Sequence, residues 1–160
     1  MAEEEEKKKK ICIIMTKGTL DAAYPPLILA STAASMDWDA SIFFTFYGLD
    51  VINKKKYKNL KVAPIANPAM PMPVPNIIGM LPGMTSMATM MMKNMMKKAN
   101  VPDIEEFIKM CKEMGVKLYG CQMTLDVMGI KEEDLIPTEA CIGAAAFLDI
   151  ASDADVTLLV

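Results

Sequence analysis

The sequence contains neither histidine nor arginine, and lysine supplies all 17 of its basic residues. A histidine general base, a histidine metal ligand and an arginine clamp on phosphate or carboxylate are therefore excluded. Acid–base chemistry is left to Cys, Asp, Glu, Lys, Tyr or water. These absences remove most hydrolase mechanisms, and the sequence predicts no metal site and no cofactor.

A strong electrostatic field is also lacking, because the net charge of the 160 residues is only −3. We therefore expect no nucleic-acid partner. No apolar run is long enough to cross a bilayer, since prolines and lysines interrupt every candidate. Residues 1–10 form a charge block and not a secretory signal. The expectation is a cytoplasmic protein, with membrane association left open but not favoured.

Four cysteines, Cys12, Cys111, Cys121 and Cys141, are far apart in the sequence and form no CxxC pair. Free thiols in a reducing compartment are favoured over a disulfide framework. Cys12 lies inside a predicted central strand and Cys111 on a predicted helix, so packing is favoured for both. Cys141 is predicted in the first turn of the last helix, where the helix dipole could activate a thiol.

Apolar runs and helical patterns alternate along residues 10–160, which we interpret as a single α/β domain after a charged arm at residues 1–9. Short apolar runs are typical of parallel strands buried on both faces; they occur at 11–15, 40–46, 116–119 and 155–160. Helices are predicted at 20–36, 49–53, 84–99, 102–114 and 138–151, with another beginning near 121. The fold class is a three-layer α/β/α sandwich with a parallel sheet of about five strands.

Some segments are less regular. Pro25 and Pro26 fall in the first helix, which should start at Pro25 or be kinked there. Residues 67–82 carry five prolines and predict an irregular connection. The basic stretch 54–61 is interpreted as a solvated turn beside the sheet, in preference to a binding patch. Thr138 is the predicted N-cap of the final helix.

A thiol stands between a predicted strand and a predicted helix at Cys121. Gly120 lets the backbone turn, so the sulfur is close to the unpaired N–H groups of the helix that follows. These donors and the helix dipole can lower the pKa of a cysteine below about 8.5. The alternative is a small apolar residue in a packed corner. Asp126 is expected to orient backbone or a neighbouring loop, because a nearby carboxylate would raise the pKa of the thiol.

The carboxyl ends of parallel strands meet at one edge of a sheet, where ligands bind. We therefore expect the loops 16–19, 46–48 and 120–122 to converge on one pocket. Gly18 would allow a close backbone approach there. Lys17 is either a positive charge beside the thiol or an exposed lysine at a turn.

Four blocks of sequence resemble the DsrE/DsrF-like family, in particular its methionine-rich branch found beside sulfur-metabolism genes. They are KGTLD and YPPL (17–21, 24–27), FFTFYGL (43–49), GMLPGM with its methionine helix (79–84), and CQMT with DVMG (121–124, 126–129). The likeness covers residues 10–160. It implies a small α/β subunit that forms homo-oligomers, carries sulfur on Cys121 as a persulfide or thiosulfonate, and passes it to other sulfur-transfer proteins.

The resemblance makes Cys121 the predicted catalytic residue, in a sulfurtransferase that acts mainly as a carrier. The predicted substrate-binding residues come from the three loops expected to converge; they are Lys17, Gly18, Thr19, Gly48 and Gln122. No family motif surrounds the other cysteines.

Residues 84–99 are rich in methionine, and Met84, Met87, Met91 and Met95 share one helical face. Methionine is adaptable, which favours packing or a subunit interface. A lid or docking surface for a partner is a second interpretation, and thioether binding of Cu(I) is a third. An alternative function follows from this helix: a non-catalytic oligomeric binding or membrane-associated accessory subunit, in which Cys121 is incidental.

Overall fold

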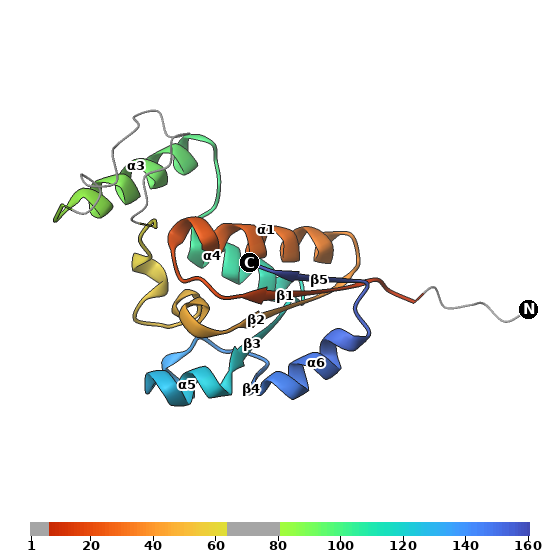
Figure 1. The fold of residues 1–160 in the computed structure, drawn as a ribbon. Helices are drawn as coiled ribbons and strands as arrows, with labels where there is room; N and C mark the ends of the chain where they lie inside the picture. The colour runs from red at the N-terminus through yellow and green to blue at the C-terminus, as the bar shows by residue number, and fades with distance from the viewer. Residues whose placement is uncertain (1–6, 64–80) are drawn as a thin grey trace, which may run out of the picture.

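The computed structural model describes residues 7–63 and 81–160, which form a three-layer α/β/α sandwich (Figure 1). Its sheet has five parallel strands in the order β4-β3-β2-β1-β5. They are β1 (Lys10–Met15), β2 (Asp39–Phe44), β3 (Lys117–Cys121), β4 (Ala140–Ile142) and β5 (Val156–Leu159). The predicted fold class is therefore confirmed.

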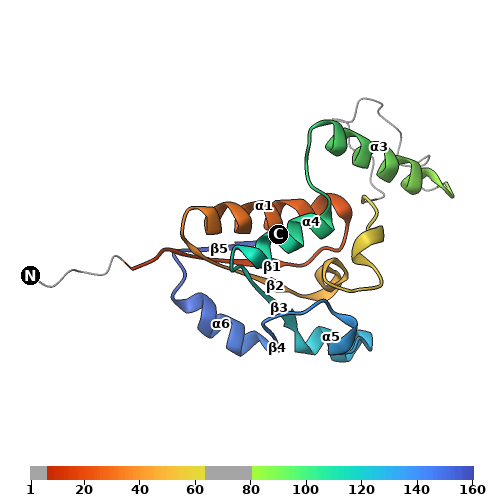
Figure 2. The same ribbon diagram turned by 180° about the vertical axis from the view of Figure 1, so that it is seen from behind.

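Helices α1 (Leu20–Ser35) and α4 (Ile104–Glu113) cover one face of the sheet, as the front and back views show (Figures 1 and 2). Alternate residues of the central strands point into this layer, among them Ile13, Met15, Ile42, Phe44 and Leu118. Leu27 of α1 and Phe107 of α4 pack in the same cluster. Fully burying one such side chain contributes about 1.5–3 kcal/mol, so this layer is the main core.

Helix α6 (Ala144–Ser152) covers the opposite face with a smaller cluster of buried side chains. Phe147 of α6 stacks on Phe43 of β2, with ring centroids 4.4 Å apart. Cys12, Tyr119 and Cys121 belong to the same cluster. Since successive strand residues point to opposite faces, the Cys121 side chain lies on the α6 side of the sheet.

Residues 140–142 form the edge strand β4, so the helix predicted over 138–151 is wrong for its first part. β4 pairs in parallel with β3, and the helix begins only at Ala144 after its N-cap Gly143. Pairing with β3 gives this segment its backbone hydrogen bonds and overrides the local helix propensity of Glu and Ala. Cys141 is consequently a strand residue, and no helix dipole activates its thiol.

Helix α1 begins at Leu20, as the predicted range 20–36 has it, and both prolines lie inside it, so the alternative start at Pro25 is wrong. Pro25 and Pro26 leave two carbonyls one turn back without their helical N–H partner. The buried face of the helix, which includes Ala23 and Leu27, holds the element together in spite of this loss.

The remaining elements agree with the prediction to different extents. The short helix predicted at 49–53 is the 3₁₀ helix η1 (Phe46–Val51), which starts three residues earlier. Further elements are η2 (Tyr57–Asn59), α3 (Met84–Lys98), α5 (Gln122–Met128) and η3 (Glu132–Asp134). The predicted irregular connection 67–82 and the predicted arm 1–9 fall mostly outside the described residues.

Helix α4 begins with a capping box, which makes its start testable. The Asp103 carboxylate accepts the Glu106 N–H at 2.9 Å, and the Glu106 carboxylate accepts the Asp103 N–H at 3.1 Å. Asp103→Ala should lower the free energy of unfolding by about 1 kcal/mol, measured by urea denaturation. Asp103→Ser keeps a capping oxygen and should lose much less, whereas equal losses in both variants would contradict a capping role.

Candidate functional site

Cys121 is the last residue of β3 and the N-cap of α5, as the sequence predicts for this corner. Its side chain is only 3% exposed. The apolar cluster around Phe43 and Phe147 surrounds it on the sheet side. The sulfur therefore lies at the carboxyl edge of the sheet, in a place largely shielded from water.

Two effects act on the Cys121 thiol in opposite directions. Burial raises its pKa, but the hydroxyls of Thr124 and Thr45 and the backbone N–H groups of Thr124 and Met123 act in the opposite direction and together outweigh burial. The pKa of Cys121 is therefore lowered from its ordinary value, because these polar groups around the corner stabilise the anion. The thiolate is the nucleophilic form of cysteine, so this site favours nucleophilic chemistry.

Sequence reasoning missed Thr45 and Thr124 and assigned the stabilisation mainly to backbone N–H groups and the helix dipole. Thr124 Oγ1 lies 3.2 Å from Thr45 Oγ1 and accepts the Phe46 N–H at 3.1 Å. Thr124 comes three residues after Cys121, in the first turn of α5, and this C-x-x-T spacing was a usable signal. Thr45 follows β2, and only the pairing of β2 with β3 brings it to the site.

The other three cysteines have thiols that resist ionisation. Burial raises the pKa of Cys111 to about 11. Burial also raises the pKa of Cys12, and it raises that of Cys141, where the nearby Glu132 carboxylate adds to the effect. Cys12 and Cys111 are fully buried, which confirms the packing predicted for them.

Cys111 packs in the main core on the α1 and α4 side of the sheet, away from Cys121 on the α6 side. Neither Cys141 nor Cys12 is within disulfide reach of Cys121. Cys141 pairs with Gly120 in the sheet, and its sulfur is 3.0 Å from the position that a Cβ on Gly120 would occupy. It therefore lies on the face of the sheet opposite to Cys121. Cys12 is level with residue 117 and two strands away, which places it about 16 Å from Cys121. A disulfide needs Cα atoms within about 7 Å on compatible sides.

Two glycines lock the loops that follow β1 and β2 against each other. A Cβ on Gly18 would lie 2.2 Å from the carbonyl oxygen of Tyr47, and a Cβ on Gly48 would lie 2.3 Å from that of Met15. The close approach expected at Gly18 is thus made by the protein's own backbone. Substrate contact at Gly18 and Gly48 stays a prediction.

The other predicted substrate-binding residues are placed differently. Gln122 follows Cys121 directly, is exposed, and donates its amide to Asp126 at 3.0 Å. Lys17 and Thr19 follow β1, two strands from β3, a separation of about 10 Å. None of the groups that lower the pKa of Cys121 is a lysine. The structure therefore brings Gln122 to the thiol corner and leaves Lys17 and Thr19 at a distance.

A cleft of about 720 Å³ lies between α1, α3 and the start of α4, with Tyr24, Tyr57 and Met96 in its lining. Neither Cys121 nor any predicted substrate-binding residue lines it. In the described ranges, no three His, Cys, Asp or Glu side chains gather as metal ligands.

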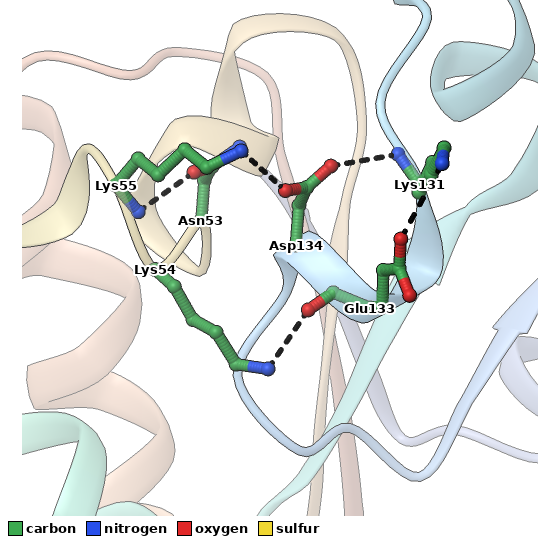
Figure 3. Close-up of polar contacts among 6 residues, drawn as sticks. All are labelled: Asn53, Lys54, Lys55, Lys131, Glu133 and Asp134. Atoms are coloured by element: carbon green, nitrogen blue, oxygen red, sulfur yellow. Dashed lines mark hydrogen bonds and ion pairs between the residues drawn. The ribbon is translucent and has the colours of Figure 1, made fainter.

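Lysine side chains of the basic stretch 54–61 bond to residues of η3 and so hold the turn against that element (Figure 3). Lys54 Nζ donates to the Glu133 carbonyl at 2.8 Å, and Lys55 Nζ pairs with the Asp134 carboxylate at 2.7 Å. Two further lysines pair with acids; the pairs are Lys56–Asp50 and Lys58–Glu105. These local ion pairs agree with the predicted solvated turn beside the sheet.

Helix α3 matches the predicted methionine helix and leaves part of its apolar surface uncovered. Met87, Met90 and Met95 are 56%, 65% and 47% exposed, whereas Met92 and Met96 pack against the main core. Within residues 7–63 and 81–160, no helix combines the length and apolar character needed to cross a membrane.

Each match to a known family or protein covers nearly the whole chain. The model of the DsrE/DsrF/DrsH-like family matches residues 7–159. The chain is 46% identical over 159 residues to the sulfur carrier protein DsrE2 of Allochromatium vinosum, covering 96% of this chain and 99% of that protein. It is 32% identical over 165 residues to the uncharacterized protein YrkE of Bacillus subtilis, covering 97% and 99%.

Among solved structures, the crystal structure of the ychN protein from E. coli superposes with a TM-score of 0.51. The match covers 95% of this chain and 99% of that chain, at 12% sequence identity, and so it supports the fold alone. Sequence identity to full-length relatives and the extent of the family match lead to one assignment: the chain belongs to the DsrE/DsrF/DrsH-like family.

Proposed function

We propose that this protein is a sulfur carrier in which the Cys121 thiolate accepts sulfane sulfur and passes it to the thiol of another protein. The observation that carries the proposal is the contrast between Cys121, whose pKa is lowered, and the three cysteines whose pKa is raised. Membership of a family with a relative named as a sulfur carrier protein supports the same role.

The transfer consists of two balanced thiol exchanges. The Cys121 thiolate attacks the outer sulfur of a persulfide donor, a new S–S bond forms at Cys121, and the donor leaves as a thiolate. An external thiolate then attacks the outer sulfur and releases the Cys121 thiolate. No added oxidant or reductant is needed, because the sulfane sulfur keeps its oxidation state in both steps.

The acceptor in this scheme is a second protein, since no internal cysteine can receive the sulfur. Cys141 lies behind the sheet, and Cys12 is about 16 Å away. Free thiols at all four positions suit a reducing cytoplasm, which we propose as the location. Other sulfur-transfer proteins are the proposed partners.

A loading experiment tests this proposal. A variant that keeps only Cys121 (Cys12→Ser, Cys111→Ser, Cys141→Ser) is incubated with inorganic polysulfide or tetrathionate and measured by intact-mass spectrometry. It should gain sulfur mass and lose it again when an external thiol is added. Cys121→Ser is the matched control and should gain none. Full loading of Cys121→Ser would overturn the proposal.

The exposed methionines of α3 favour a second candidate, an oligomeric binding or membrane-associated accessory subunit that works through this helix. A homo-oligomer with α3 at its interface would cover Met87, Met90 and Met95, and we propose this arrangement for either function. Protein that stays unmodified in the loading experiment, yet binds liposomes or a partner, would favour the second candidate.

A further inference from the structure

We infer that two copies of this chain pair through the outer edges of their β5 strands, antiparallel about a two-fold axis, so that their sheets become continuous. This surface is distinct from the α3 surface proposed above, and it makes no use of the Cys121 thiol. β5 stands at one end of the strand order, and no strand of the described residues pairs with its outer side. That edge can therefore accept a strand from another chain.

The backbone groups of β5 alternate between its inner and its outer side. Val160 bonds inward through both groups, because its N–H donates to the Ile14 carbonyl at 2.8 Å and its carbonyl accepts the Thr16 N–H at 2.9 Å. Both groups of one strand residue point to the same side, and successive residues alternate. Thr157 and Leu159 therefore direct their N–H and carbonyl groups away from β1.

β5 has none of the devices that commonly protect an edge strand. Lysine, proline and a very short length are common ones. The strand Val156–Leu159 contains neither residue, and its ladder with β1 continues through Val160. The opposite edge strand, β4, has only three residues. Leu159 is also 72% exposed, which is unusual for so large an apolar side chain in a strand. These features are typical of an edge that another chain covers.

Both faces of β5 are incompletely covered, and this favours a second copy of the chain as the occupant. Val156 and Leu158 pack against the main core on the α1 side but stay half-buried. Thr157 and Leu159 are exposed on the other face, since Thr157 is paired with Cys12 of the α6-side cluster. A single peptide would bond to the edge and leave both faces open to water. A second sandwich brings helices above and below its own edge strand.

The bonded state of Asp155 determines the register of the pair. Its N–H donates to the Lys10 carbonyl at 2.9 Å and is therefore not available to a partner. Every outward group of both strands is satisfied when Thr157 lies opposite Leu159 of the partner subunit, because such antiparallel pairs exchange both N–H···O bonds. In this register the two-fold axis passes between the two copies of Leu158.

The pairing has a consequence for the thiol. Strands of the two subunits run in opposite directions, so the carboxyl edges of the two sheets, each with its Cys121, face opposite ways. β5 is three strands away from β3 in the strand order, a separation of about 14 Å. Each Cys121 therefore lies away from the paired edges, and sulfur does not pass between the two subunits of this pair.

Disulfide trapping tests the pairing and its register, with Cys121→Ser in every variant so that sulfur chemistry plays no part. In Leu158→Cys the two new thiols lie in a non-hydrogen-bonded pair, where Cα atoms are about 4.5 Å apart. A disulfide can form at this distance, so mild oxidation should convert most of the protein into a covalent dimer.

Val156→Cys is the matched control, because Val156 lies on the same face as Leu158 and is also half-buried. It is opposite Val160 of the partner subunit, and its own two copies are about 13 Å apart. It should therefore remain a single chain under the same oxidation, as non-reducing electrophoresis will show. Equal cross-linking of the two variants, or none in Leu158→Cys, would overturn the inference.

Light scattering of proteins without added cysteines gives an independent test. Thr157→Pro removes an outward N–H, and proline is tolerated where its nitrogen faces out from an edge strand. The particle mass should fall to half that of the parent, whereas Thr157→Val keeps the N–H and should keep the mass. A monomeric parent would leave the edge to a strand of a different protein and contradict the pairing, as would an unchanged mass in folded Thr157→Pro. If Thr157→Pro does not fold, the disulfide experiment decides.

Discussion

A thiol-specific reagent added to the folded protein at pH 7 should modify Cys121 well before Cys111. The pKa of Cys121 is lowered from its ordinary value, which is about 8.5 for a free cysteine, whereas burial raises the pKa of Cys111 to about 11. The thiolate fractions therefore differ by more than about a hundredfold. Intrinsic nucleophilicity falls with pKa and removes part of this advantage. After this correction, Cys121 should still react at least about tenfold faster than Cys111.

Peptide mapping after short exposure to iodoacetamide measures this difference at each cysteine. In Cys121→Ser the fast phase should disappear, while the slow labelling of the other cysteines should be unchanged. Cys141 is the sharpest comparison, because it is more exposed than Cys121 although its pKa is raised. Faster labelling at Cys141 than at Cys121 would mean that access and not ionisation decides reactivity in this fold.

Gly48→Ala should destabilise the protein by about 1–3 kcal/mol or more, the usual cost of overpacking a closed site. An added Cβ would lie 2.3 Å from the carbonyl oxygen and 2.9 Å from the carbonyl carbon of Met15. Both are backbone atoms of a central strand, so the clash cannot be relieved by a side-chain rotation. The Gly48 N–H also donates to the Thr16 and Thr45 carbonyls, and a shift of the loop would disturb these bonds.

Gly143→Ala is the matched control for this substitution. Gly143 has φ −81°, and no atom lies within 4 Å of the position of its added Cβ. The control should change the free energy of unfolding by less than about 1 kcal/mol, because the only expected cost is that of replacing glycine by alanine at a helix N-cap. Chemical denaturation of both variants gives the comparison. Similar midpoints would show that the backbone around Gly48 accommodates the added Cβ at little cost in stability.

The strands that pattern alone could predict are those buried on both faces. The run at 11–15 is continuously apolar because helices cover both sides of the sheet, and such a run allows few other interpretations. β4 is different, because its three residues are half-buried at an edge of the sheet. Glu139 and Ala140 are residues that favour a helix, so the local sequence predicts a helix there. Its strand conformation comes from its pairing with β3, which is information about distant sequence.

The candidate site likewise has one part that the local sequence predicts and another that depends on strand order. The corner at Cys121 follows from adjacent residues, so a local sequence pattern is enough to predict it. Thr45 is 79 residues away from Thr124 in the sequence, and only strand order brings the two hydroxyls together. Lys17 could be a positive charge beside the thiol or an exposed lysine at a turn, and the strand order, which inserts β2 between β1 and β3, is what a local pattern does not contain.

The position of β5 has a consequence for how the chain is made. β1 pairs with β2 on one side and β5 on the other, and the Lys10 N–H is bonded to Asp155, 145 residues along the chain. On the ribosome, β1 therefore keeps an open hydrogen-bonding edge until the segment Val156–Leu159 emerges. Open edges of apolar strands recruit other chains. Nascent protein should thus be prone to aggregation, and dependent on chaperones, until that segment has emerged and paired with β1.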